Sequence, residues 1–300
     1  MKIYSRLDTV PRRTASGSIT PGCIVLEGGS FRGLYTGGVL DCLMEHEINL
    51  ACTIGVSAGA LNGFNYAAGQ IGRSSRFNLS HRHDKNYVGL PALIRNHGVF
   101  GFDILFDDTR NGDPLDHERF NEPHRRFIAV ATDCNTGKPA YFERGVCSDI
   151  FKAIQASASM PLFSAMVLID GQKYLDGGCS VSIPLDWALE AGYEKIVVVR
   201  TRDKSFRKTV SSKTSRRLKK LFYHNYPDFL QTMNEGYLRY NALCDRIDKL
   251  EAQNRIFVIA PSSPVTVTRL EKDMEKLGAL YWQGWQDTEN QMEALRAYLA

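Results

Sequence analysis

Apolar and polar positions along the first quarter of the chain predict two successive strand–turn–helix units. The first has a short apolar run that ends in glycines, residues 23–29, and then a helix at about 33–47, where apolar positions recur every three or four residues. The second has a strand at 51–54, a turn at 55–59 and a helix at about 58–68. Two consecutive units of this kind are typical of a sheet with helices on its faces, whose turns lie along one sheet edge.

The rest of the chain continues this alternation, although residues 70–120 have little periodicity and indicate only short helices and loops. Further strands are predicted in RFIAVATD and PAYFE around a turn at Gly137, in the hairpin MVLIDGQKYLD with its turn at Asp170-Gly171, in KIVVV at 195–199 and in RIFVIAP. Further helices are predicted at 148–157, after Pro184, at 227–251 and over 269–299, the last with a break near Gly284 beside Trp282 and Trp285.

The predicted helix at 227–251 is amphipathic, because its apolar residues alternate spacings of three and four. These residues are Leu230, Met233, Tyr237, Tyr240, Cys244 and Ile247. We expect this helix to dock on the core rather than to coil with a partner. The chain contains no internal repeat, low-complexity tract or obvious linker. The simplest prediction is therefore a single domain over residues 1–300, with a core at about 22–200 and a helical extension at about 204–300 packed on it.

Length and composition fit this α/β interpretation, since 300 residues with 43% apolar content can bury a large core without disulfides. The seven cysteines are scattered and lack the spacing of a zinc site, which indicates reduced thiols and a cytoplasmic protein. The first 22 residues lack the apolar segment of a secretory signal, and no run of about 18 apolar residues occurs. A net charge of +4 is too small to indicate a nucleic-acid partner.

One local excess of charge stands apart from this balance. The stretch from Lys204 to Lys220 holds eight basic residues and no acidic one, interleaved with serine and threonine. Such a stretch is typical of a solvated loop or helix face. The alternative is peripheral contact with anionic lipid head groups at the inner face of a membrane. The sequence leaves both interpretations open.

The candidate chemistry centres on Ser57 in the segment Gly55-Val56-Ser57-Ala58-Gly59. In a Gly-x-Ser-x-Gly turn between a strand and a helix, a nucleophilic serine sits on a strained backbone, and the flanking glycines leave room for it. Gly55 and Gly59 would form this elbow. Because glycine and serine are common residues, the match alone could be an ordinary glycine-rich loop. A nucleophilic serine also needs donors for the oxyanion and a base for its proton.

Donors could come from EGGSFRG at residues 27–33, where a predicted strand ends in glycines and a helix begins. Free backbone N–H groups at such a junction attract negative charge. The same loop could instead cradle a phosphate of a nucleotide. It lacks the Lys-Ser/Thr of a P-loop, however, and has a serine where a dinucleotide fingerprint needs glycine.

The base is harder to identify from the residues. The chain has seven histidines, and none follows Ser57 in a recognisable Asp-then-His order; they are His46, His81, His83, His97, His117, His124 and His224. Asp176 ends a predicted strand in YLDGG, beside Gly177 and Gly178. It could be a base, or its side chain could simply form an Asx turn.

Taken in order, EGGSFRG, GVSAG and DGG resemble the motifs of the patatin-like phospholipase family, as do QASASMPLFSAM and SIPLDWALEAGYEKIVVV. The resemblance covers residues 22 to about 200 well and is less specific beyond. It implies a three-layer α/β/α sandwich with a mostly parallel central sheet, related to the α/β-hydrolase architecture. It also implies a Ser-Asp dyad without a histidine, formed by Ser57 and Asp176.

The resemblance assigns the glycine-rich anion loop to six consecutive residues: Gly28, Gly29, Ser30, Phe31, Arg32 and Gly33. The oxyanion donors would be among the N–H groups of Gly29, Ser30 and Phe31. Ser30 departs from the family, which usually has a third glycine there, so its backbone must adopt a conformation that a non-glycine residue can hold. Arg32 would anchor its loop or add positive potential near an ester phosphate.

The resulting hypothesis is a serine hydrolase that cleaves carboxylic esters of phospholipids or other acyl lipids through an acyl-serine intermediate. Acyl transfer, thioester hydrolysis and lipid binding without turnover are the alternatives. No metal or organic cofactor is implied, because the nucleophile and its base are both side chains. FDDTRNGD, residues 106–113, lacks the ligand spacing of a calcium loop and is interpreted as an ordinary turn.

Overall fold

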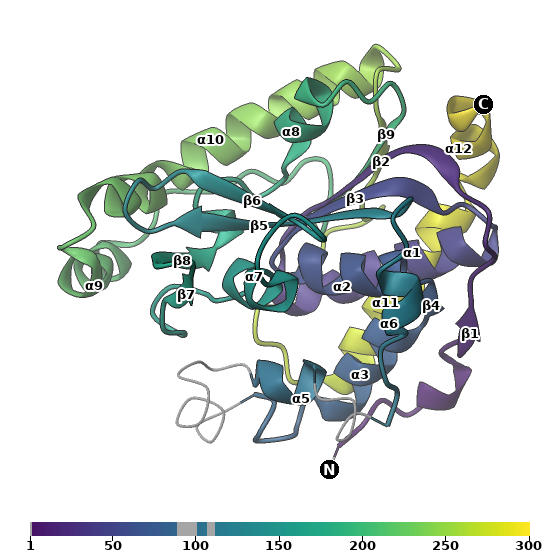
Figure 1. Cartoon of the computed structure of the whole chain (residues 1–300), viewed down its shortest axis with the longest axis horizontal. Helices are drawn as coiled ribbons and strands as arrows, with labels where there is room; N and C mark the ends of the chain where they lie inside the picture. Colours follow the sequence, from purple (N-terminus) through teal and green to yellow (C-terminus); the bar gives the residue numbers. More distant parts are fainter. Residues whose placement is uncertain (1, 89–100, 107–111) are drawn as a thin grey trace.

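The structure, a computed structural model, describes residues 2–88, 101–106 and 112–300. Its centre is an eight-stranded sheet with strand order β10-β9-β2-β3-β5-β8-β7, and β6 pairs with β5 outside this path. The five strands from β10 to β5 run parallel, whereas β6, β7 and β8 join antiparallel. The prediction of an α/β fold with a mostly parallel sheet is confirmed (Figure 1).

The strands of this sheet are β2 (Thr20–Leu26), β3 (Leu50–Val56), β5 (Arg126–Asp133), β6 (Pro139–Glu143), β7 (Val167–Ile169), β8 (Gln172–Asp176), β9 (Ile196–Val199) and β10 (Phe257–Ile259). Two short strands, β1 (Arg13–Thr14) and β4 (Gln70–Ile71), form a separate antiparallel pair.

Helices cover both faces of the sheet, as a three-layer arrangement requires (Figure 1). One face carries α1 (Gly33–Glu45), α2 (Ala58–Ala67), α7 (Ile150–Ser157) and α11 (Met274–Glu289). The other face carries α8 (Leu185–Glu190) and α10 (Pro227–Ala252). The remaining helices are α3 (Arg73–His81), α5 (Phe102–Phe106), α6 (His117–Phe120), α9 (Lys213–Tyr223) and α12 (Met292–Leu299), with 3-10 turns η1 (Leu7–Thr9), η2 (Ser30–Arg32) and η3 (Gly177–Cys179).

The apolar run of β2 is continuous because both of its faces are buried. Ile24 and Leu26 belong to the core under α1, α2, α7 and α11, whereas Cys23 and Val25 belong to the core under α8 and α10. The amphipathic helix predicted at 227–251 is α10, and the prediction that it docks is confirmed, because its Tyr240, Cys244 and Ile247 are buried in the second core.

The predicted break near Gly284 is wrong, because α11 continues through this residue to Glu289. Gly284 lies against the backbone of Tyr35 in α1, and Gly38 of α1 lies against the backbone of Tyr281 in α11. A Cβ atom at either glycine would overlap the opposite helix. The glycines therefore allow close approach of the two helices. The helical segment is interrupted later, at Asn290–Gln291, between α11 and α12.

Some predictions fall partly outside the described residues, which exclude 89–100 and 107–111. Most of the segment predicted as a turn at 106–113 is in this group. Within the described part of 70–120, the short helices α3, α5 and α6 agree with the expectation. None of the helices in the described chain is both long enough and apolar enough to span a lipid bilayer.

Candidate active site

Ser57 occupies a sharp turn between the end of β3 and the start of α2. Its φ of 55° and ψ of −120° lie in a region that side chains other than glycine rarely adopt. A Cβ atom at Gly55 would come within 2.5 Å of the backbone of Gly59, and one at Gly59 within 2.5 Å of the carbonyl oxygen of Leu26. The two glycines thus permit the crossing of backbones that holds Ser57 out of the sheet.

The register of three neighbouring strands brings Ser57 and Asp176 together. Val56 pairs with Val130 in β5, and the next residue of β5, Ala131, pairs with Asp176 in β8. The Ser57 Oγ donates a hydrogen bond of 2.7 Å to Oδ2 of Asp176. Both residues are buried, with exposed fractions of 6% and 7%.

The carboxylate of Asp176 is held from several sides. Its Oδ1 accepts a 2.7 Å hydrogen bond from the N–H of Gly178, while its backbone N–H donates to the carbonyl of Ser159. At Gly177 a Cβ atom would overlap the carbonyl of Val130. The two interpretations of Asp176 are therefore compatible: Oδ1 closes an Asx-type turn, while Oδ2 remains for Ser57.

Burial raises the pKa of Asp176 above its ordinary value of 3.8. The hydrogen bonds from Ser57 and from the N–H of Gly178 oppose this rise, as do the positive charges of Arg269 and Lys208. A carboxylate with a raised pKa accepts a proton more readily than one in water. The environment of Asp176 therefore suits a base.

Ser157, at the end of α7, was not identified from the sequence as a site residue. The backbone N–H of Ser57 donates to the Ser157 Oγ at 2.8 Å, and that hydroxyl donates to the carbonyl of Val130 at 2.6 Å. This chain of bonds fixes the strained turn to β5. The signal was present in the segment QASASMP, but nothing in its spacing distinguishes Ser157 from its neighbours.

The anion loop adjoins Ser57, since a Cβ atom at Gly28 would lie 3.2 Å from that of Ser57. Gly28 donates its N–H to the carbonyl of Ser182, and Arg32 donates to that of Gly29. Phe31 has a longer contact of 3.5 Å with the carbonyl of Arg269. Within the described chain, no protein acceptor takes the N–H groups of Gly29 and Ser30.

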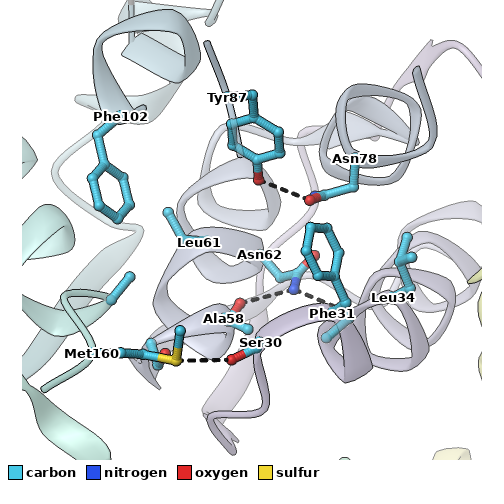
Figure 2. A pocket seen from close by; sticks show the side chains of 13 residues that line it. Ser30, Phe31, Leu34, Ala58, Leu61, Asn62, Asn78, Tyr87, Phe102 and Met160 are labelled. Carbon is cyan, nitrogen blue, oxygen red and sulfur yellow. Dashed lines mark hydrogen bonds between the residues drawn. The ribbon is translucent and has the colours of Figure 1, made fainter. Parts of the chain in front are cut away.

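Ser30 adopts a φ of 50°, in the left-handed region that favours glycine. Its hydroxyl lies 3.4 Å from the sulfur of Met160 (Figure 2). The serine therefore retains its backbone donor at the cost of some strain. At the end of the loop, Gly33 faces Ala58, whose Cβ would lie 2.7 Å from an added Cβ.

A mainly apolar cavity opens beside Ser57 (Figure 2). The lining residues come from the anion loop, α1, α2, α3, α5 and the segment after α7, and include Phe31, Leu34, Leu61, Phe102 and Met160. The polar groups among them are largely bonded to one another: Tyr87 donates to Asn78, and Asn62 donates to the carbonyls of Gly33 and Ala58.

Among the described histidines, none lines this cavity and none is hydrogen-bonded to Ser57 or Asp176. His97 lies outside the described residues. In the part of the chain that the structure describes, one group of three side chains could hold a metal ion: Cys42, His46 and Glu289. None of these lines the cavity, and the Nε2 of His46 already lies 2.7 Å from the carboxylate of Glu289.

Comparison with known proteins adds two family matches. A model described as patatin-like phospholipase matches residues 24–189, which is more than half of the chain. A second, described as a domain of unknown function (DUF6363), matches residues 226–300. The first match contains the anion loop, Ser57 and Asp176.

Several curated proteins are similar to this chain. An uncharacterized protein of Escherichia coli, YjjU, is 30% identical over 188 residues, which cover 60% of this chain and 52% of that protein. An uncharacterized NTE family protein of Mycobacterium tuberculosis, Rv1063c, is 29% identical over 171 residues, covering 56% and 46%. A protein of invertebrate iridescent virus 6 named probable lipid hydrolase 463L is 24% identical over 182 residues, covering 56% and 63%. The matched region is thus about half the length of the first two relatives.

Proposed function

Because this chain belongs to the patatin-like phospholipase family, we propose that it is a serine hydrolase that cleaves carboxylic esters of phospholipids or other acyl lipids. The observation that carries the proposal is the 2.7 Å hydrogen bond from the Ser57 Oγ to Asp176, on a strained turn beside an apolar cavity. A strained backbone, a buried base and a cavity at the same serine are not needed for folding, and together they are typical of a catalytic site.

The first half of the reaction forms an acyl-serine. The Ser57 oxygen attacks the ester carbonyl carbon, and its proton passes to Oδ2 of Asp176. The N–H groups of Gly29 and Ser30 stabilise the negative oxygen of the tetrahedral intermediate, since both are free to donate. The carbon–oxygen bond to the alcohol then breaks, and the alcohol leaves with the proton of Asp176.

The second half restores the enzyme. Water attacks the acyl carbonyl while Asp176 accepts its proton, and the same N–H groups stabilise the second intermediate. The bond to the Ser57 oxygen breaks, the acid leaves, and the proton returns to Ser57. Asp176 acts as base and then as acid in each half, which suits a carboxyl group whose pKa is raised by burial.

The cavity supports an acyl lipid as the substrate. Phe31, Leu34 and Leu61 offer the apolar surface that an acyl chain would cover, and Ser57 lies at the same wall. A thioester or an acceptor other than water would use the same dyad. Analysis of products separates these reactions, because hydrolysis releases a free acid, whereas transfer leaves the acyl group on the acceptor.

The test is a screen of acyl-lipid esters and a short-chain nitrophenyl ester, combined with labelling by a fluorophosphonate probe. Wild type should react with the probe and cleave at least one ester, whereas Ser57→Ala should do neither. Ser18→Ala is the matched control, because Ser18 is exposed and does not line the cavity. If wild type neither takes the label nor cleaves any ester, the proposal fails.

A further part of the proposal is peripheral contact with a membrane through α9. Earlier members of the basic stretch are already paired: Lys204 contacts Glu251, and Arg207 contacts Asp245 and Asp248. In α9, by contrast, the exposed side chains include three apolar ones. Leu218, Leu221 and Phe222 are 44%, 68% and 63% exposed and share one helix face. Exposed basic residues flank them: Lys213, Arg216, Arg217 and Lys220.

An apolar face flanked by cations is typical of a helix that lies in the interface of an anionic membrane. Sedimentation with vesicles, with and without phosphatidylserine, measures this contact. The double variant Leu221→Ser/Phe222→Ser should lose binding, and Arg217→Gln/Lys220→Gln should lose the preference for phosphatidylserine. Leu238→Ser is the control, since Leu238 is 55% exposed on α10. Equal binding by all variants would remove α9 from the proposal.

A further inference from the structure

Arg32 is a buried cation without a partner. Its side chain is only 8% exposed, its Nε is fully buried with no hydrogen-bond partner, and no described residue forms an ion pair with it. Other buried arginines also leave a nitrogen without a hydrogen bond to a described residue, but each has at least one side-chain partner: Arg73 donates to Asn65, and Arg125 lies 3.2 Å from the carboxylate of Glu122. Burying a charge without a partner costs free energy, so the surroundings of Arg32 are suited to binding an anion.

Three more cations lie near enough to interact electrostatically with this group, and each comes from a segment outside the anion loop. Arg202 and Lys208 follow β9, and Arg269 precedes α11. The backbone of Arg269 contacts Phe31 at 3.5 Å, and the Nζ of Lys208 donates to the Ser182 Oγ at 2.8 Å. Because the carbonyl of Ser182 accepts from Gly28, Lys208 and Arg269 both border the anion loop.

The charges in this group do not balance. Within the described chain, no carboxylate forms an ion pair with Arg32, Arg202, Lys208 or Arg269. Two acids act on these cations: Glu27 on Arg32 and Lys208, and Asp176 on Lys208 and Arg269. The carboxylate oxygens of both already accept hydrogen bonds, those of Glu27 from Thr201 and Tyr240 and those of Asp176 from Ser57 and Gly178. Burial, with a smaller effect from the charges of Arg269 and Arg32, lowers the pKa of Lys208 to about 8. An excess of positive charge therefore remains.

Strand order sets the position of these cations relative to Ser57. β9, β2 and β3 are parallel neighbours, so their carboxyl ends meet at one sheet edge. That edge carries first the loop with Arg202 and Lys208, then the anion loop, then Ser57. None of the four cations lines the apolar cavity. Ser57 thus lies between an apolar surface and a cationic one.

We propose that Arg32, Arg202, Lys208 and Arg269 form a subsite for a phosphate group, which in the lipid substrate is the phosphate joined to the glycerol of the cleaved ester. The inference rests on the proposed function for the identity of the ester, but not for the binding of phosphate. An acyl chain in the cavity, a carbonyl at Ser57 and a phosphate at the cations correspond to the order of groups in a glycerophospholipid. A phosphate with two negative charges would offset the excess positive charge.

The test compares dihexanoyl phosphatidate with dihexanoylglycerol, which has the same acyl chains without the phosphate. Arg269→Gln and Lys208→Gln each remove one cation and leave Arg32 in place. Arg269 is suitable because its side chain is exposed and makes no described bond. Lys138→Gln is the matched control, since Lys138 is exposed on the turn between β5 and β6. A second arm measures the rise in melting temperature with inorganic phosphate.

Wild type should prefer the phosphatidate, and each variant should lower the ratio of the two kcat/KM values about tenfold, mainly through the KM of the phosphatidate. The control should keep the wild-type ratio. Thermal stabilisation by inorganic phosphate should also weaken in both variants. If the ratio stays constant while that stabilisation falls, the subsite takes free phosphate rather than a head group.

An unchanged ratio together with unchanged phosphate stabilisation would overturn the inference. So would an equal loss with both esters, because that outcome indicates a structural role. The failure of the proposed function is distinguishable: a protein that cleaves neither ester but still binds phosphate through Arg269 has the subsite without the activity. A protein that cleaves both esters without regard to phosphate has the activity without the subsite.

Discussion

The charged groups on the two sides of the anion loop differ in whether the protein itself supplies their hydrogen-bond partners. On the side of β3, the carboxylate of Asp176 is held by Ser57 and Gly178, and Ser57 itself is held by Ser157. On the side of β9, Arg32 and Arg269 have no side-chain partner among the described residues, and Lys208 has only a hydroxyl. We call the side of β3 the complete side, because the protein supplies the hydrogen-bond partners of its charged group. The side of β9 is the incomplete side, because in the described chain it leaves cations without side-chain partners.

The difference fits the two proposed roles, catalysis on the side of β3 and anion binding on the side of β9. A nucleophile and its base must be oriented before the substrate arrives, so their hydrogen bonds are made within the protein. A recognition site for an anion must leave its donors available and accept the cost of burial without a partner. Substitutions that disturb one side at a time should therefore separate the two roles.

Asp176→Asn should produce the largest change by disabling the complete side. The amide can still accept from Gly178 and can donate to Ser57, but it cannot take a proton, so kcat should fall at least about a thousandfold. Asp8→Asn, at an exposed position, is the control. Turnover retained by the Asn variant would mean that another group is the base.

The same substitution should raise the melting temperature at neutral pH. Since burial places the folded pKa of Asp176 above its ordinary 3.8, the folded state holds this proton more tightly than the unfolded state. Stability is therefore lost as the pH rises from 3.8 through the folded pKa, and an amide avoids that loss. Melting curves of both proteins at acid and neutral pH measure the difference, which should be larger at neutral pH. A lower melting temperature for the variant at neutral pH would contradict the role given to burial.

Ser157→Ala should loosen the complete side without removing its chemistry. The N–H of Ser57 would lose its acceptor, at a cost of about 1–3 kcal/mol. Because small misplacements at a nucleophile are expensive, kcat should fall about tenfold to a hundredfold with little change in KM. Ser159→Ala is a close control, since among the described residues its hydroxyl donates only to the carbonyl of Gln155. Equal kcat values for the two variants would show that Ser57 needs no such support.

The incomplete side should respond to pH through Lys208. Its pKa of about 8 means that the ammonium loses its proton near this pH, and one cation of the subsite disappears. Stabilisation of wild type by inorganic phosphate should therefore be weaker well above pH 8 than just below it. In Lys208→Gln that decrease should be smaller. An identical pH dependence in both proteins would exclude Lys208 from the subsite.

Ser30→Gly should have the smallest effect, because it changes only the loop between the two sides. Glycine removes the strain of a left-handed φ but adds chain entropy in the unfolded state, for a net gain of about 0.5 kcal/mol in the free energy of unfolding. The N–H donor remains, so kcat should change less than twofold. Ser30→Ala retains the strain and should show no such gain. A large loss of kcat in Ser30→Gly would mean that the serine side chain takes part.

The sequence was sufficient for much of the fold. The strand–turn–helix units at β2–α1 and β3–α2 were predicted within a few residues, because their apolar runs and glycine turns are local signals. Gly284 was misjudged, since a glycine in a helical pattern suggests a break when the neighbouring helix is unknown. What Gly284 does depends on Tyr35, which lies far away in the sequence.

The residues of the candidate site also fall into two groups, those that a local motif marks and those whose role depends on the fold. Ser57 and Asp176 were predicted because motifs mark them, and the structure brings them together. Ser157 and Lys208 were not, because their roles come from strand register and from loops that meet at the sheet edge. Lys208 in particular was grouped with a solvated basic stretch, yet it lies against the ring of Tyr240 and beside Ser182.

The close contact of α1 with α11 limits how this chain can be divided by protein engineers. Gly38 and Gly284 each lie against the backbone of the opposite helix, and α1 begins directly after Arg32. The two helices belong to segments that different family models match. A protein shortened to the first segment would expose that contact and release the helix that follows the anion loop. We expect transfer of the first segment into another protein to succeed only when α11 is included.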